Sequence, residues 1–282
     1  MNKKIIVVII ILMLTSLACT FNVNVPSVAT EKETVLELNE AVPQNQESSQ
    51  LEIGMGAGRL NIIGGSDEWI TGEIKYNVPI WNPNISRTSN GLRIIQETKK
   101  QIGIPNNNVI NDWNIVLGDH PTDLEINAGA YQGDLDLSGI PLTKLRISDG
   151  ASQSNIKFER LNPVSMISFY YSTGASTVKF EGLANANFEN MVFEGGAGSY
   201  SLDFSGDLQR DTDIEITYGL GDVKIFIPKG VPAYVIVDGG LNNVELRGTW
   251  NVSGNEYSIE GSGPQLFFTV KMGLGNLQLI SQ

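Results

Sequence analysis

The sequence has little of the side-chain chemistry on which most enzymes depend. Its 282 residues include one cysteine, Cys19, and one histidine, His120. A single cysteine excludes an internal disulfide and a thiolate metal site in the folded domain. His120 stands in the turn-like segment Gly-Asp-His-Pro at 118–121, where neither a Ser–His pair nor a histidine-rich metal site is expected. We therefore expect no cofactor and no metal.

Basic residues are also scarce. The chain has 19 Lys and Arg against 31 Asp and Glu, which gives a net charge of −12. Two of the basic residues, Lys3 and Lys4, precede a long apolar run at the start of the chain, so the remainder is still more acidic. An acidic surface disfavours binding to nucleic acid and to anionic lipid, and it keeps a secreted domain soluble.

From residue 51 onward, apolar residues alternate with polar ones, a period of 2 that is typical of strands and not of helices. Eight glycines punctuate this pattern, and the residues three and five positions before each of them are all apolar. The glycines are Gly56, Gly129, Gly150, Gly174, Gly196, Gly219, Gly240 and Gly273. After the first interval, which spans a less regular segment, they recur every 21–24 residues, apart from the last interval of 33 residues. Such a period indicates a stacked repeat architecture.

Each repeat is expected to be a strand, a glycine turn and a second strand. One such unit cannot bury its apolar face alone, whereas a stack of units forms a continuous core. The pattern predicts an all-β solenoid, with each coil about 4.8 Å above the previous one. We expect the turns after Gly129 and Gly150 to be two residues longer than the others, because the next apolar pairs begin at Leu135 and Ile156. The glycines themselves indicate either a positive φ or a close approach of the adjacent coil.

Stacking also predicts columns of outward residues. After the turn this column is expected to contain Asn61, Asp136, Lys157, Lys179, Ser201, Lys224, Glu245 and Gln278. In it, Asp136 would pair with Lys157, and Lys224 with Glu245. A solvated structural ladder and a polysaccharide-binding face are both compatible with this column. The four tryptophans, Trp69, Trp81, Trp113 and Trp250, fall outside the sixteen apolar positions before the glycines. Such residues cap the ends of a stack or stack on sugar rings.

The N-terminal segment has the features of a secretion signal. Lys3 and Lys4 are followed by an apolar run at 5–14 and then by Thr-Ser-Leu-Ala-Cys at 15–19. This resembles a bacterial lipobox, although Ser16 stands where leucine is usual. We predict a lipoprotein signal peptide at 1–18, lipid attachment at Cys19, a flexible tether at 19–33 and one β-solenoid domain at 34–282. That domain divides into an N-terminal part at 34–118 and regular repeats at 119–282.

Several segments resemble the toast-rack domain of bacterial envelope proteins. They are residues 51–77, Asn82-Pro83, the Gly-Leu-Arg-Ile of 91–94, the Trp-Asn-Ile-Val-Leu of 113–117, and residues 124–139 with their Leu-Asp-Leu-Ser-Gly ending. The resemblance implies a right-handed, β-helix-like stack and adhesin-like repeats. Relatives in a cell-wall-antibiotic response carry transmembrane helices that are not recognisable here, so that role is not transferred.

Two functions from different classes remain. The first is a non-enzymatic, lipid-anchored, extracytoplasmic binding or scaffold module, adhesin-like, with an envelope protein or a polysaccharide as partner. The alternative is a carbohydrate-active β-helix enzyme, a lyase or hydrolase that would use paired carboxylates such as Asp134/Asp136, Asp211/Asp213 or Asp222. A cleft lined by three or more carboxylate or basic side chains would favour the enzyme, and a scaffold should lack one. We favour the non-enzyme, because no second acidic or basic cluster accompanies these carboxylates in a matching repeat.

Overall fold

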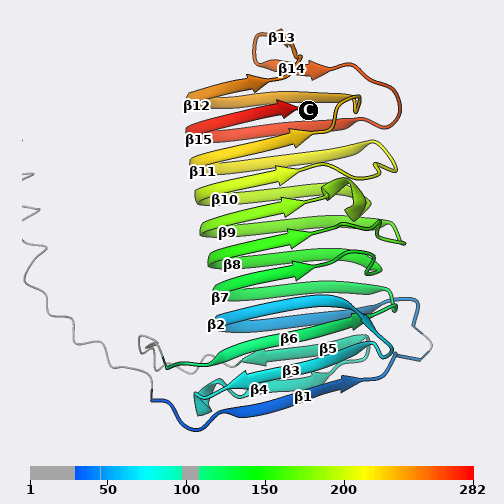
Figure 1. The fold of residues 1–282 in the computed structure, drawn as a ribbon, viewed down its shortest axis with the longest axis vertical. Helices are drawn as coiled ribbons and strands as arrows, with labels where there is room; N and C mark the ends of the chain where they lie inside the picture. Colours follow the sequence, from blue (N-terminus) through cyan, green and yellow to red (C-terminus); the bar gives the residue numbers. More distant parts are fainter. Residues whose placement is uncertain (1–28, 45, 97–107) are drawn as a thin grey trace, which may run out of the picture.

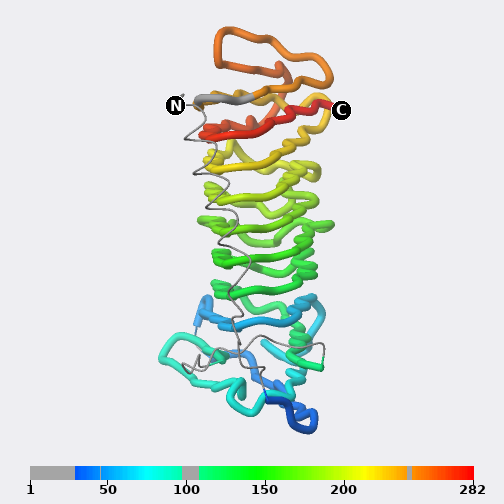
Figure 2. The backbone as a smooth tube through the Cα atoms, turned by 90° about the vertical axis from the view of Figure 1, so that its left-hand side faces the viewer, coloured from blue at the N-terminus to red at the C-terminus, as the bar shows by residue number. Residues whose placement is uncertain are grey.

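The computed structural model describes residues 29–44, 46–96 and 108–282, with the side chains of 240–242 left out. The described chain forms one 15-stranded sheet that is wound into a tall column (Figure 1). Short antiparallel strands lie at one end of the column and a hairpin at the other (Figure 2). The predicted all-β, solenoid-like stack of short repeats is thus confirmed.

Each regular coil is a single long strand with a bend at its glycine. These strands are β2 (Ser49–Ser66), β7 (Thr122–Asp136), β8 (Leu142–Lys157), β9 (Met166–Glu181), β10 (Phe188–Asp203), β11 (Thr212–Ile227), β12 (Ala233–Arg247) and β15 (Leu266–Ser281). The parallel ladders continue on both sides of the bend. The expected strand–turn–strand unit is therefore one strand with two arms. In Figure 1 the bends gather on the left of the column and the connecting loops on the right.

The core lies between the two arms of each strand. All sixteen apolar positions before the glycines are buried, from Leu51 and Ile53 at one end to Phe268 and Val270 at the other. The second arms contribute a further layer, such as Leu202 in β10 and Ile225 in β11. Each arm alternates inward apolar and outward polar residues, so burial against the opposite arm fixes the register of every coil.

The expected longer turns after Gly129 and Gly150 are not present. Gly133 and Ser154 stand in register with Val178 of β9, at the first inward position after the bend. The bends therefore have a common length, and small residues replace the apolar one in two coils. Tyr131 fills part of the space, since a Cβ on Gly133 would lie 2.5 Å from its ring. The outward column shifts accordingly, and Asn61 lies beside Asp134 instead of Asp136.

The coils do not follow the order of the sequence at the C-terminal end. β15 pairs with β11 on one side and with β12 on the other, so the last strand of the chain lies between these two strands in the stack. The long interval between Gly240 and Gly273 contains β13 (Asn251–Ser253) and β14 (Glu256–Ile259), a hairpin that pairs with the first arm of β12. Lys224 consequently lies beside Gln278, and the expected Lys224–Glu245 pair is wrong. The expected register of Asp136 with Lys157 is confirmed.

Short strands close the N-terminal end. β5 (Gly91–Gln96) and β6 (Asn111–Gly118) pair in parallel with the two arms of β2 and together form an incomplete lower coil. β1 (Thr34–Glu40), β3 (Ile70–Tyr76) and β4 (Pro83–Arg87) add antiparallel layers beneath it. Trp69 and Trp113 are buried in this region. They cover the core where the regular stack ends, as expected for residues that cap a solenoid.

Close approach of neighbouring coils explains the glycines at the bend. A Cβ placed on Gly196 would lie 2.1 Å from the carbonyl oxygen of Gly174, and one on Gly174 would lie 2.5 Å from that of Gly150. Gly129, Gly150, Gly219 and Gly273 face the preceding glycine of the stack in the same way. None of these six glycines has a positive φ. Backbone contact, and not a left-handed conformation, therefore excludes a side chain at the bend.

We predict that Gly196→Ala lowers the urea midpoint, with a loss of about 1–3 kcal/mol from overpacking against the Gly174 carbonyl. Gly56→Ala is the matched control. Gly56 occupies the same position in β2, but an added Cβ there meets no atom within 4 Å. Its effect should stay within about 0.5 kcal/mol. Equal shifts of the two midpoints would show that contact between the coils is not what requires glycine.

Candidate binding groove

Three adjoining hollows lie beside the bend and form a groove that runs across several coils. The first has a volume of about 490 Å³ and lies between Trp81, the segment 109–112, and the bends of β2 and β7. The second, about 460 Å³, extends along the second arms of β2, β6 and β7. The third, about 560 Å³, is a shallow and widely open depression over β7, β8, β9 and β10. Gln132 lines all three hollows, so they adjoin one another.

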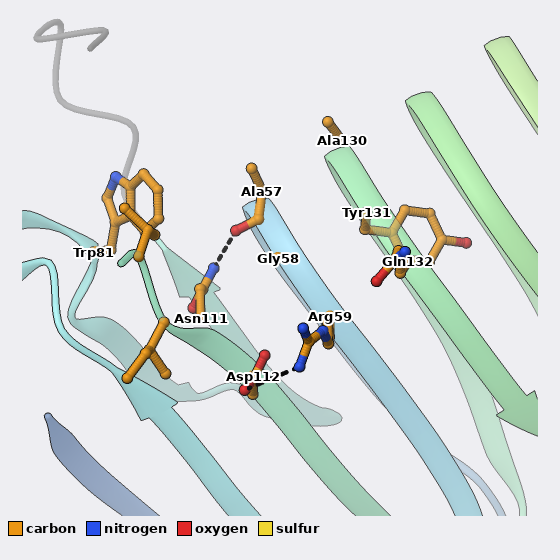
Figure 3. Close-up of a pocket in the computed structure, with 11 residues that line it drawn as sticks. Ala57, Gly58, Arg59, Trp81, Asn111, Asp112, Ala130, Tyr131 and Gln132 are labelled. Carbon is orange, nitrogen blue, oxygen red and sulfur yellow. Dashed lines mark hydrogen bonds and ion pairs between the residues drawn. The ribbon is translucent and has the colours of Figure 1, made fainter. Parts of the chain in front are cut away.

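A buried amide network holds Trp81 at one end of the groove. Trp81 ends the short 3-10 helix η2 (Pro79–Trp81), and its carbonyl accepts a hydrogen bond from Gln96 Nε2 at 2.8 Å. Gln96 also pairs with Asn111, whose Nδ2 donates to the carbonyl of Ala57 at 2.6 Å. Both amide side chains are buried. Figure 3 shows Trp81 and the residues Ala130–Gln132 on opposite sides of β2, with the hollow between them.

One charged pair faces this hollow. Arg59 of β2 and Asp112 of β6 stand opposite each other in the ladder, and their side chains approach to 3.9 Å (Figure 3). The Arg59 side chain is 71% exposed, so the pair adds little to stability. Its guanidinium and carboxylate remain accessible to a ligand. Because their charges are opposite, the pair adds no net charge to the groove.

Farther along, the groove has a small apolar floor and a neutral polar wall. The residue after each bend glycine is alanine in four successive coils, namely Ala130, Ala151, Ala175 and Ala197. Two positions later stand Gln132, Gln153, Thr177 and Ser199, also in register. In the described part of the chain, none of these four polar side chains has a hydrogen-bond partner. Each coil thus presents a methyl group and a free amide or hydroxyl.

The half-buried carboxylate of Asp149 organises the floor from beneath. Asp149 accepts hydrogen bonds from Tyr171 at 2.9 Å, from Thr173 at 2.5 Å, and from Ser152 and Ser176 at 3.2 Å. Burial, with the Asp149 charge as a smaller cause, raises the pKa of Tyr171 well above its usual range, so this hydroxyl stays a donor. Ser152 and Ser176 also line the third hollow. Their orientations are therefore fixed before any ligand arrives.

The paired carboxylates of the sequence are divided among different places in the structure. Asp213 lines a separate hollow of about 270 Å³ with Glu215 and Lys271, which pair with each other at 2.6 Å. Asp136 accepts the backbone N–H of Ser138, and Asp211 that of Gln265, so both hold loops. Asp134 lines the second hollow with Arg59 and Asp112, which makes three charged side chains there. Arg59 and Asp112 pair at 3.9 Å, and Asp134 forms no ion pair or hydrogen bond with either of them in the described chain. Within the described ranges, no three His, Cys, Asp or Glu residues gather as a metal site.

His120 forms a pair that the sequence analysis did not expect. Its Nε2 lies 2.9 Å from Ser49 Oγ, although the two residues are 71 positions apart. The Ser49 hydroxyl donates its proton to Gln46 Oε1 at 2.8 Å, so His120 must be the donor to Ser49. A catalytic histidine would instead accept the serine proton. Both residues are buried, with 1% and 8% exposure, and Trp69 contacts the imidazole edge. The pair is therefore structural.

Burial lowers the pKa of His120 below 6.5. At pH values between 6.5 and this lower pKa, His120 is protonated in the unfolded chain but not in the folded chain. The free energy of unfolding therefore falls as the pH falls through this range. We expect the urea midpoint of the wild type to decrease more steeply from pH 7.5 to pH 5.5 than that of His120→Gln. The glutamine amide keeps a donor for Ser49 but does not titrate in this window. Parallel slopes for the two proteins would contradict this assignment.

The predicted lipid attachment site, Cys19, and the signal peptide at 1–18 lie outside the described residues. Among the described residues, no helix is long and apolar enough to cross a membrane. The structure places seven of the eight predicted glycines at the bends of their strands. Gly240 occupies the same register position of β12, between the pairs Gly239–Met272 and Leu241–Leu274. Sequence analysis singled out Trp81 but missed the columns of alanines and of polar residues in the groove. These columns could have been found, because their members stand one and three positions after successive bend glycines.

The fold is similar to those of several solved bacterial proteins. A putative cell adhesion protein from Clostridium sporogenes matches over 89% of this chain and 99% of its own, with 22% identity and a TM-score of 0.50. A putative adhesin from Bacteroides fragilis matches over 90% and 99% of the two chains, with 10% identity and a TM-score of 0.45. A putative lipid binding protein from Parabacteroides distasonis covers 90% and 98%, with 10% identity and a TM-score of 0.36. These likenesses concern the fold alone.

No curated protein matches the chain. The model of the N-terminal domain of toast_rack, DUF2154, matches residues 24–165, which is half of the sequence. This range includes the N-terminal cap and the coils β2, β7 and β8. It therefore includes Trp81, the Arg59–Asp112 pair and the first two polar residues of the groove, Gln132 and Gln153. The chain belongs to the toast-rack family.

Proposed function

We propose that this protein is a non-enzymatic binding module of the bacterial envelope, adhesin-like and anchored on the extracytoplasmic side by a lipid on Cys19. The observation that carries the proposal is the groove across in-register coils, in which Gln132, Gln153 and Thr177 have no hydrogen-bond partner in the described chain. Such a surface can hold an elongated partner through many small contacts. A preformed site also loses little conformational entropy on binding.

The chemistry of the groove supports binding rather than turnover. Hydrolysis or elimination of a glycan needs two titratable groups that act together on one bond. In the second hollow, Asp134 is accompanied only by the mutually paired Arg59 and Asp112. His120, the one histidine, is buried and serves as a hydrogen-bond donor. The described groove thus offers recognition groups without an acid–base pair.

The anchoring half of the proposal rests on the sequence. Cys19 is the single cysteine and follows an apolar segment of signal-peptide type at the start of the chain. Lipidation with more than one acyl chain gives stable attachment without a spanning helix. The solved relative from Clostridium sporogenes, named as a putative cell adhesion protein, has the same fold. We extend an adhesion-type role to this chain as part of the proposal.

For the anchor, we expect the wild-type protein to partition with membranes and to incorporate labelled palmitate. Cys19→Ser should appear in the soluble extracytoplasmic fraction without label, because the lipid is the expected attachment. Fractionation with metabolic labelling measures both effects. A wild-type protein that is soluble, or whose mature chain begins at another residue, would exclude Cys19 as the anchor.

For the groove, we expect the full chain carrying Cys19→Ser to be retained on isolated cell envelopes. Ala175→Arg should reduce this retention about tenfold or more, because the long side chain fills the floor of the third hollow. Leu220→Arg is the matched control. Leu220 occupies the same position after its bend glycine, is 55% exposed and lies outside the hollow. Equal retention of the two variants, measured by sedimentation with the envelopes, would remove the groove from the function.

A further inference from the structure

From the groove we infer the class of its ligand: a linear, uncharged glycan that lies along the solenoid axis, with one sugar unit over each coil. This inference rests on the proposed binding function and adds the chemistry of the partner. The residues that carry it are Trp81, Gln132, Gln153 and Thr177, together with the alanine floor. Four properties of the groove, namely its length, its side-chain chemistry, its charge and its paired backbone, lead to this ligand.

The groove is long, open and periodic. It extends from β2 over β7, β8 and β9 to β10, and five parallel strands span roughly 20 Å at the usual spacing. One coil advances by about 4.8 Å, close to the length of one pyranose unit in an extended chain. A polymer of sugars can therefore meet an equivalent set of side chains at each step. A compact ligand would leave most of this length empty.

The lining matches the two surfaces of a sugar ring. Pyranose rings present C–H groups on their faces and hydroxyl groups around their edges. The methyl groups of Ala130, Ala151 and Ala175 offer an apolar floor, while Gln132 and Gln153 stand beside it with unpaired donors and acceptors. At the N-terminal end stands the partly buried Trp81, whose backbone carbonyl is held by the amide network described above. An aromatic face is a common platform for ring C–H groups.

The charge of the site selects against acidic polymers. The groove contains one internally neutral pair, Arg59 with Asp112, and the single additional carboxylate of Asp134. The whole chain carries a net charge of −12. An anionic glycan or a nucleic acid would meet a repulsive field and no cluster of basic side chains. An uncharged chain encounters no such penalty.

An extended peptide fits the groove less well. Peptides that bind to sheets usually add a strand to a free edge, where backbone groups are unpaired. Here the floor consists of β7, β8, β9 and β10, each hydrogen-bonded to a neighbour on both sides. No strand edge opens into the third hollow. Recognition must therefore come from side chains, which favours a ligand that carries many hydroxyl groups.

The test is a titration of the full chain carrying Cys19→Ser with cello- and chito-oligosaccharides from the disaccharide to the hexasaccharide, followed by calorimetry and tryptophan fluorescence. Affinity should rise with length up to about five units, the number of coils in the groove. Oligogalacturonate of equal length is the anionic comparison and should bind more weakly. Fluorescence should change on binding through Trp81, and Trp81→Ala should abolish the change, because Trp69 and Trp113 are buried and Trp250 lies outside the lining of the groove.

Three variants locate the ligand. Trp81→Ala and Ala175→Arg should each weaken binding about tenfold or more, while Leu220→Arg should leave it unchanged. Ala175 is exposed, so this variant reports on the groove even if Trp81→Ala disturbs the N-terminal cap. Binding that is indifferent to both groove variants, independent of length, or stronger for oligogalacturonate would overturn the inference. If the protein is retained on envelopes but binds no oligosaccharide, the glycan inference alone is overturned. If it shows neither envelope retention nor oligosaccharide binding, the proposed binding function is overturned as well.

Discussion

At the bends from β2 to β15, the backbone of one strand lies directly against the backbone of the next in the stack. The carbonyl of Gly174 occupies the place that a Cβ of Gly196 would need, and the same relation recurs from Gly129 to Gly273. This contact makes the bend tight and gives all coils a common turning point. Because side chains alternate along a strand, a fixed turning point determines which residues of both arms face inward. The continuous core between the arms depends on it.

The groove depends on the residue beside this turning point. The position after the bend glycine is outward, and alanines occupy it from β7 to β10. Beyond the groove the position is taken by Leu220 and Leu274, both about half exposed, and the third hollow does not extend to them. Inside the bend, the ring of Tyr131 fills the volume that a side chain at Gly133 would otherwise occupy. Small residues therefore shape both the outer floor and the inner packing.

Local periodicity made the core predictable from the sequence, whereas contacts between residues far apart in the sequence could not be predicted. The sixteen apolar positions before the glycines could be predicted from the alternation of apolar residues and the repeat alone, and all of them are buried. The insertion of β15 between β11 and β12 depends on competition among strands of similar pattern, which spacing does not reveal. Gly133 and Ser154 broke the apolar pattern and suggested longer turns, and the ring that compensates at Gly133 comes from another position, Tyr131. The Ser49–His120 bond joins residues 71 positions apart, beyond the reach of any local motif.

For the candidate site, the sequence supplied single residues but not their arrangement. Trp81 and Asp134 were both noted, yet their relation required β5 and β6 to pair with the arms of β2. That pairing brings Gln96 and Asn111 together and ties η2 to the first coil. The N-terminal cap thus adds an aromatic end to a groove that the repeats alone would leave uniform along its length. A periodic surface binds a polymer in many equivalent registers, and a single unique end removes this degeneracy by favouring the register in which a terminal unit reaches Trp81.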